Sequence, residues 1–225
     1  MAKKKQTVED QNLENVQEAL NTTSVWIEKN QNKLTWSITI IALVVTGVLA
    51  LNTYVIKPKA VEVSNENAKA VAYFMQGDWE KALNGDDAEC VGFQAIADEY
   101  KMYQGGKLAA LYAGVCYYQL GQYEEAAAYL NKFSANDLTI EPAALQLLGD
   151  AYVQMEDYSK AVKAFESAAK SGNDLIAPMS LKKAGLVYLE LGDKAAAKKA
   201  FEAIKADYPA SSEAQSIDAY IAIAQ

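Results

Sequence analysis

The arrangement of apolar residues changes abruptly along this chain. Residues 34–56 form an uninterrupted run of 23 residues without a charge, bounded by Lys33 and Lys57. Beyond this run, apolar residues recur at intervals of three and four, which is the spacing of amphipathic helices. The pattern therefore predicts one apolar helix followed by an all-helical domain.

The apolar run is long enough to cross a lipid bilayer. At about 1.5 Å rise per residue its helix spans roughly 34 Å, and a hydrocarbon core measures about 30 Å. Trp36 and Tyr54 lie near its two ends, where amphipathic aromatic rings prefer the membrane interface. We expect a transmembrane helix anchored by these two residues. A buried helix of a soluble domain and a signal peptide cleaved near Ala50 are the alternatives.

Lysine placement predicts the orientation of this helix. The flanking lysines are Lys3, Lys4, Lys5, Lys29 and Lys33 before it, and Lys57, Lys59 and Lys69 after it. Because lysine is enriched on the cytoplasmic side, we expect segment 1–33 in the cytoplasm of a bacterium and the downstream domain in the periplasm, held at the inner membrane.

The segment before the membrane helix has a partial amphipathic pattern of its own. Within residues 9–30 the apolar positions are Leu13, Val16, Leu20, Val25 and Ile27, with Trp26 close to the membrane. A helix of this kind either lies on the membrane surface or docks onto a membrane complex. The spacing is compatible with both.

The downstream region repeats with a period of 35 or 36 residues. Each copy has a glycine, a tyrosine three residues later, an alanine twelve residues after the glycine, and a large apolar residue four positions further on. The copies are Gly114, Tyr117, Ala126 and Leu130; Gly149, Tyr152, Ala161 and Phe165; and Gly185, Tyr188, Ala197 and Phe201. We expect each copy to form two antiparallel helices that approach most closely at the glycine and the alanine, because only small residues permit that approach.

A degenerate copy precedes these three. Its turn begins at Gly77 and its packing alanine is Ala82, but about seven extra residues within 84–92 predict a loop. The expected organisation is a linker at 57–61, four helical units and a terminal capping helix. The units are 62–106, 107–141, 142–177 and 178–211, and the cap is 212–225.

This pattern resembles the tetratricopeptide repeat over residues 62–211, with Pro209 at the closing proline position. Glu156 and Lys194 depart from it, replacing a turn glycine and a turn aromatic residue. The resemblance implies an all-α solenoid of about four helix pairs whose first helices line a concave groove. It places ten residues in that groove, unless some pack between repeats: Leu111, Val115, Tyr118, Gln119, Asp150, Val153, Gln154, Lys182, Leu186 and Leu189.

The groove chemistry favours one kind of ligand. Leu111 and Val115 stand where repeats that hold a C-terminal carboxylate carry lysine and asparagine. We therefore expect an extended apolar or mixed peptide, or a segment of a partner protein, as the ligand.

Composition argues against catalysis and nucleic-acid binding. The chain has no histidine, all 21 of its basic residues are lysines, and residues 60–225 carry a net charge of −10. The commonest general base and metal ligand is therefore missing, as is the preferred reader of phosphate and guanine. We expect no enzyme activity, no cofactor or metal and no small-molecule substrate.

The two cysteines and one acidic turn offer weaker candidates. Cys116 is expected as a small core residue and Cys90 in the extra loop, with a disulfide between them as the alternative. Asp86, Asp87 and Glu89 are expected to form a solvated turn, with weak calcium binding as the alternative.

The layout as a whole resembles one family. A short N-terminal segment ending WIEKNQNK at residues 26–33, one membrane helix and then helical repeats are similar to the YfgM-type ancillary subunits of the bacterial Sec translocon. The resemblance implies a chaperone-like adaptor whose partners are translocon subunits, a periplasmic folding factor or exported polypeptides. A scaffold of another envelope assembly (secretion, cell-wall or motility) and a cytoplasm-facing signalling adaptor are the alternatives.

Overall fold

The computed structural model describes residues 2–86 and 89–225, and the side chains of residues 16, 20–86 and 89–225. These residues form helices and no strand, which confirms the all-α expectation. The chain divides into two compact units, Met1–Pro58 and Lys59–Gln225. Each is described by itself.

The first unit consists of α1 (Ala2–Leu51) and a short π-helix, η1 (Asn52–Ile56). Among the described residues, one helical stretch, Leu20–Met75, is long and apolar enough to cross a membrane, and its most apolar window has no buried side chain. A core helix of a soluble domain would be buried, so that alternative is not supported. Trp36 of α1 and Tyr54 of η1 are both exposed.

The expected linker at 57–61 is helical, because α2 (Lys57–Met75) begins directly after η1. The Lys57 N–H donates to the Asn52 carbonyl, five residues back. Such a π-turn accommodates Pro58, which has no N–H and would clash with a carbonyl in a regular α-helix. The helix therefore continues where a break was expected.

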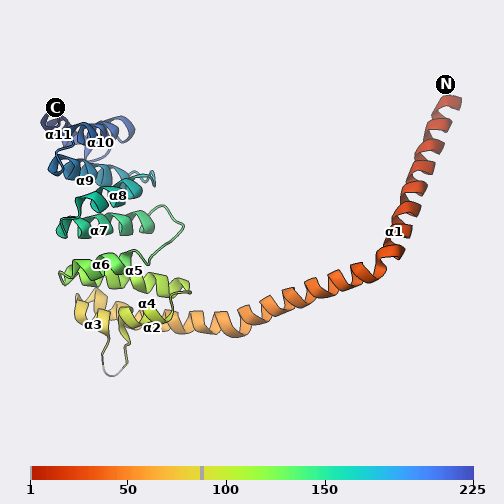
Figure 1. Ribbon diagram of the computed structural model, residues 1–225, viewed down its shortest axis with the longest axis horizontal. Coiled ribbons are helices and arrows are strands. Elements are labelled where there is room, and N and C mark those ends of the chain that lie inside the picture. The colour runs from red at the N-terminus through yellow and green to blue at the C-terminus, as the bar shows by residue number, and fades with distance from the viewer. Residues whose placement is uncertain (1, 87–88) are drawn as a thin grey trace. The chain divides into compact units, whose positions relative to one another are not determined.

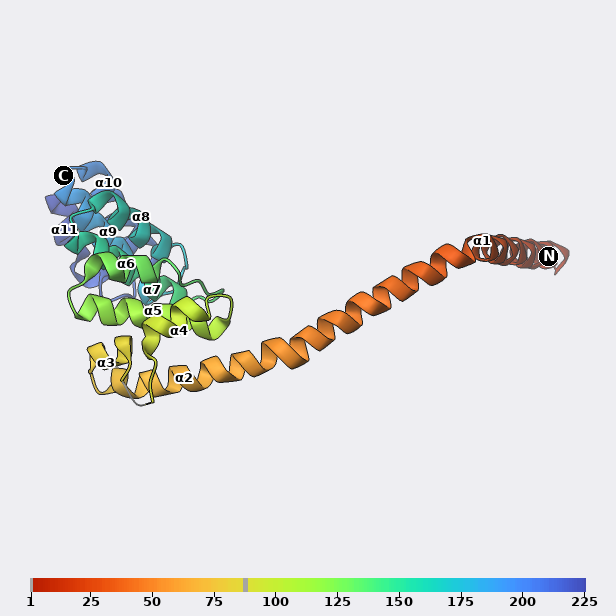
Figure 2. The ribbon, with the colours of Figure 1, turned by 60° about the horizontal axis from the view of Figure 1, so that its bottom comes forward.

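The second unit is a stack of helix pairs that follow one another in chain order (Figure 1; Figure 2). In the first pair, α2 is followed by a split second helix, α3 (Trp79–Asn84) and α4 (Gly92–Glu99). The remaining elements are α5 (Gln104–Gln119) with α6 (Tyr123–Leu130), α7 (Ile140–Gln154) with α8 (Tyr158–Ala169), α9 (Ile176–Glu190) with α10 (Lys194–Asp207), then η2 (Ala214–Ser216) and the capping helix α11 (Ile217–Ile223).

Three unit boundaries differ from expectation by two or three residues. Starts were expected at 107, 142 and 178, whereas α5, α7 and α9 begin at Gln104, Ile140 and Ile176. Side chains just upstream decide two of these starts. The Asp137 carboxylate accepts the backbone N–H of Ile140, and Asn173 Oδ1 accepts that of Ile176. These bonds satisfy helix donors that have no partner within the helix.

The repeat glycines lie where the paired helices touch, as expected. A Cβ placed on Gly149 would lie 2.5 Å from the Phe165 ring, and one on Gly185 would lie 2.3 Å from the Phe201 ring. At Gly114 the corresponding atom is Leu130 Cγ, at 2.6 Å. The large apolar residue sixteen positions after each glycine therefore packs directly on its backbone.

Polar ties reinforce the stacking of consecutive pairs. The Asp98 carboxylate of α4 accepts a hydrogen bond from the Tyr129 hydroxyl of α6, at 2.8 Å. It also forms an ion pair with Lys132 Nζ, again at 2.8 Å. Burial by itself raises the pKa of the Asp98 carboxyl, but these two donors outweigh it and hold the pKa below its usual value. The carboxylate thus stays ionised while it links two consecutive helix pairs of the second unit.

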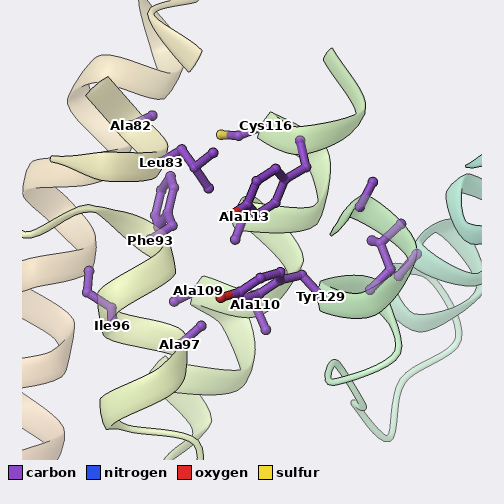
Figure 3. Packing of buried hydrophobic residues seen from close by; sticks show 14 of the residues in the cluster. Ala82, Leu83, Phe93, Ile96, Ala97, Ala109, Ala110, Ala113, Cys116 and Tyr129 are labelled. Atoms are coloured by element: carbon purple, nitrogen blue, oxygen red, sulfur yellow. The ribbon is translucent and has the colours of Figure 1, made fainter. Parts of the chain in front are cut away.

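Both cysteines are core residues. Cys90 and Cys116 are both buried and unbonded. Figure 3 shows the Cys116 sulfur pointing from α5 toward α3, where Leu83 lies. Burial raises the pKa of the Cys116 thiol to about 12. Cys116 is therefore a small core residue, and Cys90, although it belongs to the extra loop, is buried as well.

The acidic turn also has a structural role. The Asp86 carboxylate accepts hydrogen bonds from the Tyr73 hydroxyl, at 2.5 Å, and from the backbone N–H groups of Glu89 and Cys90. Asp87 lies outside the described residues. Elsewhere in the described chain, no group of three or more histidine, cysteine or acidic side chains is placed to hold a metal ion.

Candidate functional site

An apolar pocket of about 420 Å³ lies between α5 and α7. Its lining from α5 is Leu108, Leu111, Tyr112 and Val115, and from the start of α7 it is Thr139, Ile140, Ala143, Ala144 and Leu147. No charged side chain is among them. We call this feature the α5–α7 pocket.

The pocket follows from a shortened helix. α6 has 8 residues, whereas the equivalent helices α8 and α10 have 12 and 14. Residues 131–139 then cross to α7 as an irregular connection of turns and bends, and α7 packs mainly along α8 while meeting α5 over only a short stretch. The facing side chains of α5 and α7 are therefore left with space between them.

The connection that forms one wall is held in place by hydrogen bonds. The Asp137 carboxylate accepts the N–H groups of Thr139 and Ile140, at 2.7 and 2.5 Å, and these bonds lower its pKa. Asn173 Nδ2 donates to the Leu138 carbonyl from the next connection along the stack, at 3.0 Å. The wall is therefore held by hydrogen bonds within the chain itself.

The pocket opens to solvent through apolar side chains. Ile140 at the rim is 49% exposed, and Leu108 on the opposite wall is also exposed. Covering large apolar side chains is favourable by roughly 1.5–3 kcal/mol for each one fully buried. An apolar ligand group therefore gains free energy from this opening, and a charged one does not.

Only two of the ten predicted groove residues, Leu111 and Val115, line the pocket. Tyr118 lies one turn further along α5, where burial and then the charge of Asp150 raise its pKa. Asp150 is engaged by Lys183 Nζ at 2.6 Å. It is therefore already paired.

The other predicted residues fall into two groups. Val153, Lys182 and Leu189 are used in packing: Val153 lies against the cluster around Phe165, Leu189 lies against the cluster around Phe201, and Lys182 Nζ lies 4.9 Å from the Tyr220 ring of the capping helix. Gln119, Gln154 and Leu186 are exposed. Three of these six residues thus make packing contacts and three are open to solvent, and their role in a groove stays a prediction.

The sequence interpretation missed most of the wall opposite α5. Ile140, Ala143 and Leu147 share one face of α7 by their spacing of three and four, a signal that was present in the sequence. The missing information was the early end of α6 at Leu130, which exposes that face. No motif in the sequence marks that end.

Comparisons with known proteins agree with this architecture. Tetratricopeptide repeat models match residues 108–137 and 147–212, so the chain carries tetratricopeptide repeats. The unmatched stretch between them contains the Thr139–Ala144 part of the pocket wall. A comparison with curated protein sequences finds no match.

Solved structures show the same fold at low sequence identity. Two crystal structures of MamA align with TM-scores of 0.52 and 0.54, at 21% and 20% identity, covering 69% and 72% of this chain and 81% and 80% of theirs. A putative kinesin light chain of Podospora anserina with nearly identical tetratricopeptide-like repeats aligns with a TM-score of 0.54 at 16% identity, over 73% of this chain and 85% of that one.

Proposed function

We propose that this chain, whose repeats belong to a class that mediates protein–protein interactions, is a membrane-anchored adaptor that binds an apolar segment of a partner protein in the α5–α7 pocket. The observation that carries the proposal is the apolar pocket on the repeat scaffold. Its lining contains no ionisable group except the Tyr112 hydroxyl. It offers burial of apolar surface and no acid–base chemistry.

The anchor is the apolar segment 34–56. A helix that is apolar all round is normally covered by protein or by lipid, and the apolar side chains of this stretch are exposed in the chain itself. With the lysine bias of the flanks, we propose that the N-terminus is cytoplasmic and that the repeats lie in the periplasm of a bacterium, at its inner membrane.

The layout supports an ancillary role beside the protein translocon. In this role the partners are translocon subunits, a periplasmic folding factor or emerging exported polypeptides, which expose the apolar segments that the pocket accepts. A structural scaffold of another envelope assembly would use the same anchor and repeats with different neighbours.

Site-specific photocrosslinking tests the pocket. A photoreactive residue replaces Ile140 at the rim or Leu191, which is 48% exposed and lies outside the pocket lining, as a matched control. We expect partner adducts from position 140 and few from position 191. In addition, Ala143→Phe should fill the pocket and abolish the adducts at 140. Equal labelling at both positions would refute the pocket as the binding site.

Crosslinking from the anchor identifies the neighbours. Photoreactive residues within 34–56 should recover the translocon channel from intact membranes. Recovery of a secretion, cell-wall or motility component instead would favour the scaffold function. Protease treatment of spheroplasts should degrade the repeat domain if it is periplasmic, and protection of that domain would overturn the orientation.

A further inference from the structure

Three exposed apolar side chains recur at equivalent places in the second unit. They are Met102, Leu138 and Leu175, which are 36 and 37 residues apart and are 85, 69 and 73% exposed. Each belongs to a connection between consecutive helix pairs and lies one or two residues before the next helix begins. Single exposed apolar residues are ordinary on a protein surface, but a set that follows the repeat is a regular feature of the stack.

Hydrogen bonds join the three connections into one edge, which Figure 1 shows along one side of the stack. The connections are residues 100–103, 131–139 and 170–175. Lys107 Nζ, at the start of α5, donates to Ser134 Oγ of the second connection at 3.3 Å. Asn173 Nδ2 of the third connection donates to the Leu138 carbonyl of the second at 3.0 Å. We call the three connections together the connection edge.

The first helix of the second unit begins at the same edge. The Tyr100 hydroxyl donates to Glu62 Oε1 of α2 at 2.8 Å, and Lys59 Nζ lies 5.5 Å from the centre of the Tyr100 ring. Further along α2, Asn67 Nδ2 donates to the Gly105 carbonyl at 2.9 Å. The N-terminal half of α2 is thus fixed to the first connection.

The chain itself brings this edge close to the membrane segment. Lys59 follows Ile56, the last residue of the apolar run, by three residues. Three residues of chain span at most roughly 11 Å. A bilayer that holds segment 34–56 is therefore within reach of the start of α2 and of the connection that is fixed to it.

The charge of the edge permits contact with anionic lipid. Residues 60–225 carry a net charge of −10, which by itself would repel such a surface. The three connections, however, hold Lys101, Lys132 and Lys170 against Asp137 and Asp174. The helix turns that adjoin the connections, with the first turn of α2, add three lysines and four carboxylates. The edge is therefore neutral overall, and most of the acidic excess lies elsewhere on the domain.

The form of the apolar surface favours lipid over a protein partner. Met102, Leu138 and Leu175 come from separate connections, and each directly follows a charged residue. They form separate apolar points along the edge. A protein partner packs against a continuous surface of complementary shape. Fluid lipid accepts separate apolar side chains at the boundary between headgroups and acyl chains, while the neighbouring charges stay in water.

We propose that the connection edge lies on the surface of the lipid bilayer and inserts Met102, Leu138 and Leu175 among the lipids. The contact rests on the proposed membrane anchor. It places the rim of the α5–α7 pocket next to the membrane, because Thr139 and Ile140 of the pocket wall follow Leu138 directly. The pocket then receives apolar partner segments close to the bilayer.

Fluorescence quenching by spin-labelled lipid tests the contact. Single cysteines are introduced into the full chain by Met102→Cys, Leu138→Cys or Leu175→Cys and labelled with a small fluorophore. The purified chain is reconstituted into vesicles of phosphatidylethanolamine and phosphatidylglycerol that carry a nitroxide high on the acyl chains. Met75→Cys is the matched control, because Met75 is 78% exposed and lies at the other end of α2. The wild-type chain, whose native thiols are buried, is the labelling blank.

The expected result is a difference between the two ends of the helix pairs. Quenching at the three edge positions should exceed that at Met75→Cys at least roughly threefold, because interfacial side chains reach about 5–10 Å into the boundary where the nitroxide lies. Equal quenching at all four positions, or none at the edge, would overturn the contact. An edge made for a protein partner would give the second result, since these vesicles contain no other protein.

Substitutions at neighbouring connections show whether the edge acts as a unit. Met102→Asp combined with Leu175→Asp should reduce quenching at Leu138→Cys to the level of Met75→Cys. Met75→Asp combined with Leu191→Asp, at exposed positions where α2 and α9 end, should leave it unchanged. Loss with both pairs, or with neither, would refute the edge as the contact surface.

Flotation of the vesicles distinguishes this failure from failure of the anchor. A chain that floats but shows no preference for the edge overturns only the contact. A chain that does not float with the vesicles overturns the anchor and the contact that rests on it.

Discussion

The same turn joins the two helices of every repeat, and one copy contains a residue that does not suit it. Gly121 has φ 75° and Gly192 has φ 77°. In each of these turns a backbone hydrogen bond closes the end of the helix. Glu156 occupies the equivalent position at φ 59°, with its N–H bonded to the Val153 carbonyl at 3.0 Å. The backbone requirement is thus common to the repeats, although the residue is not.

The expected effect of exchanging these residues follows from the backbone alone. A residue with a side chain lowers the free energy of unfolding by about 1–2 kcal/mol when its backbone is in the left-handed region. Glycine lowers the free energy of unfolding by about 0.4–1 kcal/mol, because it makes the unfolded chain more flexible. The difference is roughly 1 kcal/mol in favour of glycine. A Cβ at Gly121 or Gly192 would meet no atom within 4 Å, so no clash adds to this value.

Thermal unfolding of the full chain in detergent, followed by circular dichroism, measures the effect. Glu156→Gly should raise Tm by about 2–4 °C and Gly121→Ala should lower it by a similar amount, since 1 kcal/mol corresponds to that shift in a chain of this size. Glu156→Ala removes the carboxylate but keeps the strained backbone, so it should leave Tm nearly unchanged.

The comparison of these three variants can refute the reasoning. If Glu156→Ala raised Tm as much as Glu156→Gly, the gain would come from relief of charge repulsion in this acidic domain. If Gly121→Ala left Tm unchanged, the left-handed backbone would not be the cause of the cost.

Further predictions address packing, thiols and pH. Gly185→Ala should destabilise by about 1–3 kcal/mol, measured by urea unfolding, because its Cβ would meet the fully buried Phe201 ring. Cys90 and Cys116 should both resist a thiol reagent at pH 8 in the folded chain and both react after denaturation, since they are unbonded and burial raises their pKa values; a disulfide would leave no thiol to titrate. Because the folded-state pKa of Asp98 is lowered, its contribution to stability is present above the unfolded-state pKa and is lost as pH falls through the folded-state value. The difference in Tm between the wild-type chain and Asp98→Asn should therefore shrink between pH 6 and pH 3, and a constant difference would contradict this linkage.

Local chemistry let the sequence predict the architecture. The length of the uncharged run 34–56 and the repeat of glycine, tyrosine and alanine depend on residues close in the chain, and they specify an apolar helix and a stack of helix pairs. The close contacts at Gly149 and Gly185 follow from the same rule, because a residue without a side chain is needed wherever two helix backbones meet.

The candidate site depended on tertiary structure. Whether Val153 or Leu189 faces a ligand or a neighbouring helix is a matter of how successive repeats are placed, and apolar spacing is the same in both cases. The α5–α7 pocket exists because α6 ends at Leu130 and the following connection carries Ile140 into the wall. The sequence by itself thus determined the anchor candidate, the repeats and the absence of histidine chemistry. The packing of one repeat on the next decided where an apolar surface stays open, because an open surface is a property of the space between elements and not of any element alone.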